Sequence, residues 1–113
     1  PDLASGLTRS PALLIEGLAT FFLTFVVFAA STSGGSSSRA LSAMAGGLAI
    51  TAGSLFSAPF TGGAMNPARA FGPALMANHW TNHGVYWVGP LGGGVLAAWI
   101  YHAVFARPVS SPD

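Results

Sequence analysis

The chain has no cysteine and no lysine, and charged side chains make up only 6% of its 113 residues. Without cysteine it has no disulfide framework, no thiolate nucleophile and no cysteine-ligated metal. Soluble domains carry about 25% charged residues, so these charges are too few to cover a solvated surface. A formal net charge of +1 favours neither nucleic acid nor an acidic partner. Paired carboxylates, a phosphate loop and a nucleophile–base pair are also missing, so we predict no enzyme, no cofactor and no metal site.

Hydrophobic residues, by contrast, make up 51% of the chain and gather in three runs, at about 12–30, 40–56 and 84–106. Each approaches or exceeds the length of about 20 residues with which a helix crosses a bilayer. The Ser/Gly-rich stretch 31–39 between the first two is typical of an aqueous turn. We therefore predict an integral, multi-pass membrane protein. Small residues recur every four positions in two runs, which favours close helix packing in lipid: Ala45, Ala49, Gly53 and Ser57, then Gly89 and Gly93.

The stretch 57–78 differs from these runs. Its apolar part, 67–77, is 11 residues, about 16 Å as a helix at 1.5 Å per residue, or half a bilayer. We predict that it enters the membrane and returns without crossing. The fold class is then an all-α membrane protein, with three transmembrane helices and one re-entrant half-helix in a single repeat over 1–113.

The half-helix begins with chemistry suited to a pore. Asn66 is a good N-cap and Pro67 a good first helical residue, so free N–H groups and the positive end of the dipole point back toward Asn66. Arg69 projects from the same face. The backbone carbonyls of 62–65 have no regular hydrogen-bond partner, and such backbone is tolerated at membrane depth only where it is buried in protein or lines a water-filled cavity. These groups suit a neutral hydrogen-bonding solute and repel cations; the alternative is an ordinary cap with an interfacial arginine. The candidate pore residues are Gly62, Gly63, Ala64, Met65, Asn66, Pro67, Ala68 and Arg69.

Four motifs together resemble the second half of an aquaporin, a member of the major intrinsic protein family, over nearly the whole chain. The run 66–69, Asn-Pro-Ala-Arg, is similar to the second signature of that family, and 71–74, Phe-Gly-Pro-Ala, continues it. The run 82–91 resembles the start of the last helix, and Glu16 with Thr20 resembles the Glu-x-x-x-Thr of the fourth helix.

The resemblance implies a role for individual pore residues. Asn66 would donate hydrogen bonds to the permeating molecule at mid-pore. Arg69 would form the selectivity filter with the Gly63 carbonyl and with Ser54, which stands where many water channels place a histidine.

The resemblance to the family also implies which side chains orient the re-entrant loop. Glu16 would accept hydrogen bonds from the loop backbone and orient its carbonyls, which suits a buried carboxylate in need of donors. Thr20 lies one turn further on, where a plain hydroxyl-to-backbone bond is the alternative to a loop-orienting role.

Water is the solute that we expect. Glycerol-conducting relatives usually carry an acidic residue where this chain has Ala70, and they tend to replace the pair Tyr86-Trp87. The small Ser54 and Gly63 would widen the filter, so glycerol, urea or ammonia remains an alternative. A structural membrane subunit that conducts nothing is the competing hypothesis from another class.

The family fold has two inverted repeats, so the resemblance implies a second one. The chain is the C-terminal half of a full channel, a half-channel that pairs with an inverted copy of itself, or a remnant without transport. Arg9 on one side against Arg39 and Arg107 on the other gives a weak positive-inside bias, which permits both orientations. The expected partners are the bilayer, the second repeat and the other subunits of a possible tetramer.

His79 and His83 flank Trp80 with a spacing that suits a metal ion. No third ligand is near, so we predict that they anchor the chain at the membrane interface.

Overall fold

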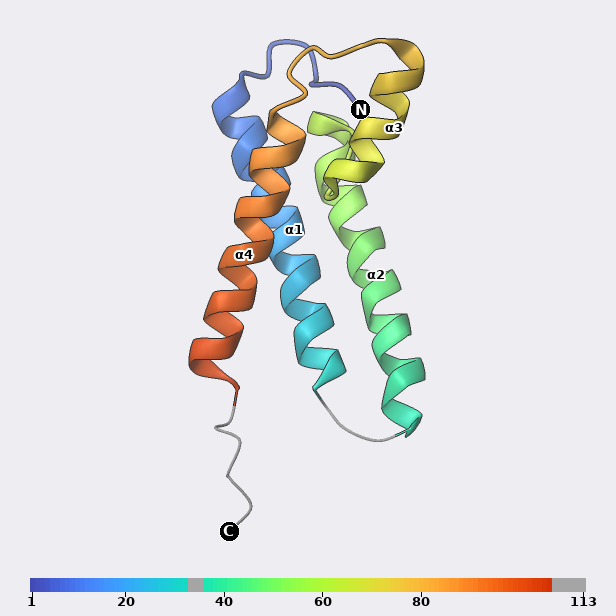
Figure 1. Ribbon diagram of the computed structural model, residues 1–113, viewed down its shortest axis with the longest axis vertical. Helices are drawn as coiled ribbons and strands as arrows, with labels where there is room; N and C mark the ends of the chain where they lie inside the picture. The colour runs from blue at the N-terminus through green and yellow to red at the C-terminus, as the bar shows by residue number, and fades with distance from the viewer. Residues whose placement is uncertain (33–35, 107–113) are drawn as a thin grey trace.

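A computed structural model describes residues 1–32 and 36–106, with residues 36–38 as backbone only. Within these residues the chain forms four helices and no strand, as expected of an all-α protein. They are α1 (Arg9–Ser31), α2 (Ser36–Thr61), α3 (Pro67–Ala77) and α4 (Val85–Val104). The three long helices run side by side, and the short α3 lies at the end that also holds the N-terminus (Figure 1).

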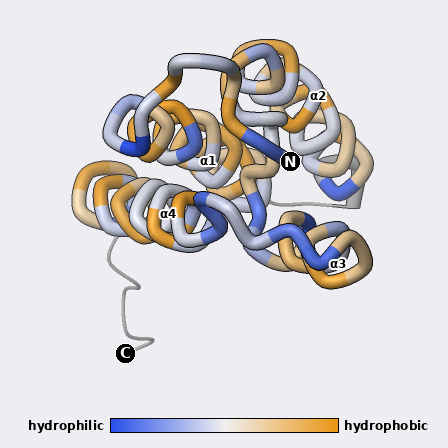
Figure 2. The backbone as a smooth tube through the Cα atoms, turned by 90° about the horizontal axis from the view of Figure 1, so that it is seen from above, coloured by the Kyte–Doolittle hydropathy of each residue, from blue (hydrophilic) through white to orange (hydrophobic). Residues whose placement is uncertain are grey.

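Two of the described helices are long and apolar enough to cross a membrane, α1 and the part of α2 from Arg39 to Thr61. Helix α4 coincides with the third expected span and has 20 residues, but its glycines and His102 lower its hydropathy, and its crossing stays a prediction. Hydrophobic residues lie on all sides of the helices (Figure 2). Leu55 is 75% exposed and Met76 is 87% exposed, and so much apolar surface requires lipid or protein around it.

Helix α1 is central, since it packs against both α2 and α4. Gly89 and Gly93 of α4 lie on α1 so closely that a Cβ at position 93 would overlap the Gly17 carbonyl. On α2 the stripe of small residues is turned inward, with Ala49 and Ser57 buried. The small-residue pattern therefore marks the helix–helix contacts, as predicted.

The bounds of α2 differ from the sequence-based expectation at both ends. The helix continues past residue 56 to Thr61, so the first residues of the expected re-entrant stretch, 57–61, are helical. The Ser57 hydroxyl donates to the Gly53 carbonyl at 2.7 Å, four residues back, which satisfies it inside the helix. The single hydroxyl proton of Thr61 goes to the Glu16 carboxylate at 2.6 Å rather than to the Ser57 carbonyl at 3.2 Å. Helix α2 also begins at Ser36, within the expected turn, because serine suits a helix start as well as a loop. Arg107, used in the charge comparison, lies outside the described residues.

The N-terminal segment packs over the loop between α2 and α3. The N–H of Ala4 donates to the carbonyl of Phe60 at 2.7 Å. Leu3 packs against a buried cluster of Ala64, Ala70 and Tyr86. The loop is therefore covered on one side by the chain's own first residues.

Candidate functional site: a half-helix and its supporting loop

Helix α3 begins at Pro67 and ends at Ala77, the range expected from sequence. Asn66 has extended backbone (φ −158°), and its Oδ1 accepts from the N–H groups of Ala68 at 2.9 Å and Arg69 at 3.4 Å. At the other end Asn78 adopts a left-handed conformation (φ 47°) and closes the helix. The cap chemistry of Asn66 and Pro67 thus fixes the start of α3 as predicted.

The carboxylate of Glu16 in α1 binds the loop between α2 and α3 through hydrogen bonds. Its side chain is fully buried. Oε1 accepts from the Thr61 hydroxyl at 2.6 Å and from the Ala64 N–H at 3.1 Å, and Oε2 accepts from the Met65 N–H at 2.7 Å. Three donors on one carboxylate compensate the cost of burying it. This carboxylate therefore fixes the loop to α1 and to the end of α2.

The loop needs unusual backbone to present those N–H groups. Gly62 (φ +84°), Gly63 (φ +64°) and Met65 (φ 50°) are all in the left-handed region. Glycine adopts this region at no steric cost, whereas methionine does so under strain. The carbonyls of 62–65 accept no hydrogen bond from the described residues.

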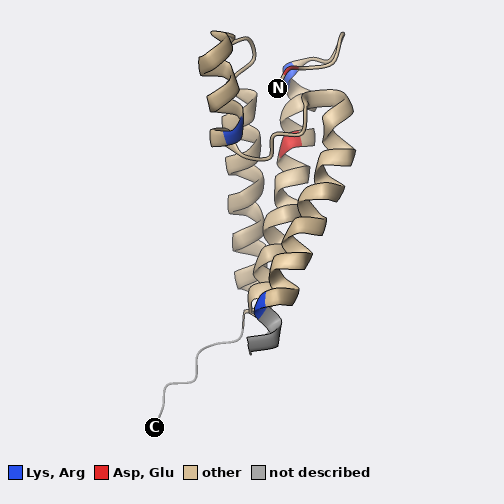
Figure 3. Ribbon diagram, turned by 90° about the vertical axis from the view of Figure 1, so that its right-hand side faces the viewer, with Lys and Arg blue, Asp and Glu red and all other residues tan. Residues whose placement is uncertain are grey.

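Asn66 and Arg69 border a hollow of about 150 Å³. Leu23 of α1 and Ile50 of α2 form an apolar wall, while Asn66, Arg69 and the loop residues form a polar one. Both polar side chains are exposed, and Arg69 pairs with no carboxylate in the described chain. Figure 3 shows how sparse the charged positions are, with the basic position of α3 and the acidic position of α1 near the loop. The hollow thus has an amide, a guanidinium and an apolar surface along its border.

Comparison with known proteins identifies the family. The family model described as "Major intrinsic protein" matches residues 2–101. The chain belongs to the major intrinsic protein family.

Aquaporin TIP4-1 of Zea mays is 46% identical over 103 residues, which are 91% of this chain and 40% of that protein. Aquaporin-4 of Mus musculus and of Homo sapiens are each 44% identical, with 91% of this chain and 32% of theirs covered. The chain thus spans less than half the length of these curated relatives. The predicted resemblance is confirmed, and this major intrinsic protein is an integral membrane protein of a family of channels, not of enzymes.

The structure of this major intrinsic protein brings some of the sequence-predicted residues together and separates others. Ala64, Met65, Asn66 and Arg69 share the hollow. Ser54 is half-buried and does not line it. Gly63 is buried behind it, against Ser57 and Ala58, so a filter of Arg69 with Ser54 and Gly63 remains a prediction.

Thr20 does not orient the loop in this structure. Its hydroxyl donates to the Glu16 carbonyl at 2.7 Å, a bond within α1. This is the plain hydroxyl-to-backbone bond, which satisfies a buried hydroxyl without a partner from another segment.

Two supporting residues were missed by sequence reasoning. Thr61 donates to Glu16, and its carbonyl accepts from the Tyr86 hydroxyl at 2.7 Å. Tyr86 is 1% exposed, so it ties α4 to the end of α2. Thr61 extends the four-residue series of Gly53 and Ser57, which is the signal that could have found it.

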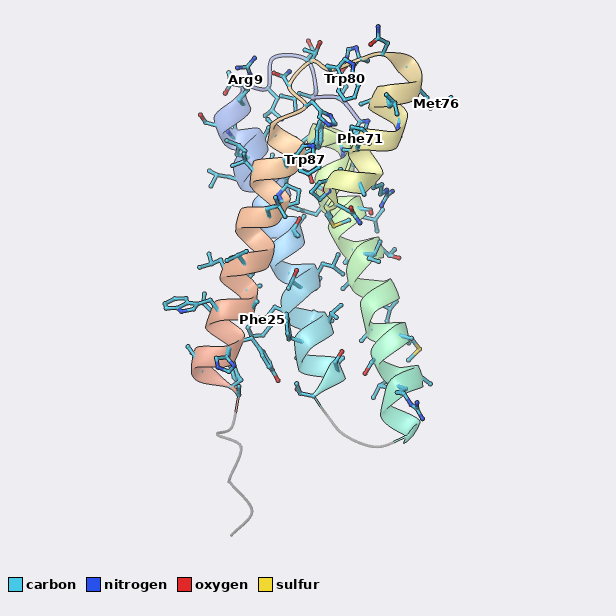
Figure 4. The ribbon with its side chains drawn as sticks, in the orientation of Figure 1. Arg9, Phe25, Phe71, Met76, Trp80 and Trp87 are labelled. Atoms are coloured by element: carbon cyan, nitrogen blue, oxygen red, sulfur yellow. The ribbon has the colours of Figure 1, made fainter. Side chains whose placement is uncertain are left out.

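The two histidines near Trp80 have separate partners. His79 Nε2 lies 3.1 Å from Asp2 Oδ2, and His83 Nε2 accepts from Trp87 Nε1 at 3.0 Å. Trp80 stacks obliquely on Phe71, with ring centroids 5.7 Å apart. Figure 4 shows Phe71, Trp80 and Trp87 together near the end that holds α3, an arrangement that suits an aromatic belt at the membrane interface.

Proposed function

We propose that this chain forms half of a passive transmembrane pore for water, and that a second, inverted repeat supplies the other half. The observation that carries the proposal is the hollow at the start of α3, where Asn66, Arg69 and the loop residues Ala64 and Met65 lie beside Leu23 and Ile50. Membership of a family whose members include aquaporins supports it.

The hydrogen bonds of Asn66 support separate roles for its side-chain oxygen and its side-chain nitrogen. Its Oδ1 is occupied by the N–H groups of Ala68 and Arg69, so only its amide N–H groups remain for a solute. A water molecule there accepts from the amide and donates to a loop carbonyl. The helix N-terminus and Arg69 add positive potential, which repels cations while a neutral molecule passes.

The exposure of the site supports a second repeat. Asn66 and Arg69 are exposed, and within the described residues α3 contacts α4 and no other helix. With 11 residues, α3 reaches about halfway across a bilayer. An inverted repeat, either a second copy of this chain or a separate N-terminal half, would close the open side and continue the path.

A pore for another small neutral solute is the second candidate. Gly63 has no side chain, and Ser54 is small, so a filter built with them is wider than one built with histidine. Measuring glycerol and urea uptake beside water flux in the same vesicles separates the two: exclusion of both solutes supports water, and comparable uptake supports the wider pore.

The absence of cysteine makes the location of the pore directly testable. Ile50→Cys places a thiol in the hollow, and Leu55→Cys places one on a different face of α2, where Leu55 is 75% exposed. In proteoliposomes, a water-sized mercurial should inhibit the water flux of Ile50→Cys and leave Leu55→Cys and the parent chain unchanged. Equal inhibition of both variants, or of neither, would mean that water does not pass this hollow.

A further inference from the structure

Two hollows adjoin on the outer side of α1 and α4. The first, of about 360 Å³, is bordered by Arg9, Trp80, Asn82 and His83, and we call it the headgroup hollow. The second, of about 290 Å³, is apolar and lies along both helices; we call it the acyl groove. Leu13 and Val88 border both, so the two hollows are adjacent, one with a polar border and one with an apolar border.

The polar end holds an arginine that is oriented but not neutralised. Arg9 Nε donates to Asn82 Oδ1 at 2.9 Å, and Asn82 reaches it from a left-handed turn (φ 56°). The remaining guanidinium N–H groups pair with no carboxylate in the described chain, since Asp2 is engaged by His79. Figure 4 shows Arg9 and Trp80 at the same end of the molecule. A guanidinium with free, directed donors is well suited to bind a phosphate.

The apolar end is open because glycines line it. A Cβ at Gly92 would meet no atom within 4 Å. Leu14 and Leu18, 67% and 59% exposed, form one wall of the groove, and Leu96, 50% exposed, belongs to the other. A long crevice with exposed leucines on both sides has the shape and chemistry to hold a hydrocarbon chain.

The groove lies away from the proposed pore. We call the hollow that Asn66 and Arg69 border the pore hollow. Leu23, which also borders it, is six residues from Gly17 of the groove. At about 100° per residue this places the two about 120° apart around α1. An inverted repeat that closes the pore hollow would therefore leave this face to lipid.

We propose that the headgroup hollow and the acyl groove together bind one anionic phospholipid, with its phosphate on Arg9 and one acyl chain along Gly92. The alternatives fit less well. A free phosphate would use only the polar end, and an apolar helix of a partner would fill the groove but leave the Arg9 guanidinium unpaired. The proposal does not depend on whether the chain conducts water.

Native mass spectrometry of the detergent-purified protein tests the polar end. The protein is mixed with equal amounts of phosphatidylglycerol and phosphatidylcholine, and Arg9→Gln is compared with Arg39→Gln at the other end of the molecule. We expect preferential retention of phosphatidylglycerol, reduced about tenfold in Arg9→Gln and unchanged in Arg39→Gln. Equal retention of both lipids, or an equal loss in both variants, would overturn the proposal.

A second pair of variants tests the apolar end. Gly92→Leu fills the groove, and Gly47→Leu is its control on α2, since a Cβ at either glycine meets nothing within 4 Å. Gly92→Leu should lose phosphatidylglycerol, and Gly47→Leu should retain it. Glycerol phosphate has no acyl chain, so it should bind detectably to neither variant. Retention by Gly92→Leu would exclude the acyl groove, and tight binding of glycerol phosphate would indicate a plain anion site.

Discussion

Glu16 shows how a single side chain determines the geometry of the site. It is fully buried, and its two oxygens accept hydrogen bonds from Thr61, Ala64 and Met65. The donors come from the end of α2 and from a loop with three left-handed residues, two of them glycine. The carboxylate therefore compensates for the backbone strain of the loop and supplies acceptors for N–H groups that have no backbone partner.

Replacing this carboxylate should disorder the loop. Glu16→Leu leaves three buried donors unpaired, at about 1–3 kcal/mol each, so we expect a loss of several kcal/mol. The amides of Ala64 and Met65 should then exchange with solvent much faster, as measured by hydrogen–deuterium exchange.

Two comparisons make this result specific. Thr20→Val, which removes a bond within α1, should leave loop exchange unchanged. Glu16→Gln keeps one acceptor oxygen and should lie between the parent and Glu16→Leu. Unaltered protection of Ala64 and Met65 in Glu16→Leu would show that other contacts hold the loop.

At this scale, local chemistry was predictable and long-range contacts were not. Asn66 as a cap follows from its position before Pro67, and a buried Glu16 without donors would be too costly, so both roles could be read from sequence and resemblance. The contributions of Leu23 and Ile50 to the hollow depend on how α1 and α2 cross. No pattern in either segment specifies that crossing.

Among the elements, the short helix α3 was the most predictable because both of its ends carry their own signals. Asn66 and Pro67 start α3, and Asn78 ends it in a left-handed conformation. The end of α2 was misplaced because Ser57 and Thr61 are polar in sequence but have partners in the structure, the Gly53 carbonyl for Ser57 and the Glu16 carboxylate for Thr61. Hydropathy cannot distinguish such residues from those of a loop.

The crossing of α1 and α4 depends on two glycines in direct contact. A Cβ at position 93 would overlap the Gly17 carbonyl, whereas a Cβ at the neighbouring Gly92 meets nothing within 4 Å. Gly93→Ala should therefore lower the free energy of unfolding in mixed micelles by about 1–3 kcal/mol. Gly92→Ala is the matched control and should be neutral or slightly stabilising, since alanine is the better helix former. Equal stabilities of the two variants would argue against this close crossing.

At the scale of the whole molecule, much of the surface has no partner within the described chain. Large apolar side chains remain exposed on every helix, and the polar side of the pore hollow is open. In the pore that we propose, these surfaces face lipid on the outside and an inverted repeat at the start of α3. Family membership and the all-helical fold followed from motifs and composition, but no pattern in the sequence identifies the partner that we propose to close the pore.

Osmotic shrinkage of proteoliposomes, followed by stopped-flow light scattering, tests the central claim most directly. Vesicles contain either this chain alone or the chain with an inverted aquaporin repeat, and each set includes Asn66→Leu at the same amount of inserted protein. We predict rapid shrinkage with a low activation energy wherever the pore is complete, and a large reduction in Asn66→Leu. Fast shrinkage of the chain alone would identify its own inverted copy as the second half. Shrinkage at the rate of protein-free lipid in both sets, or an undiminished rate in Asn66→Leu, would contradict a water path through this site.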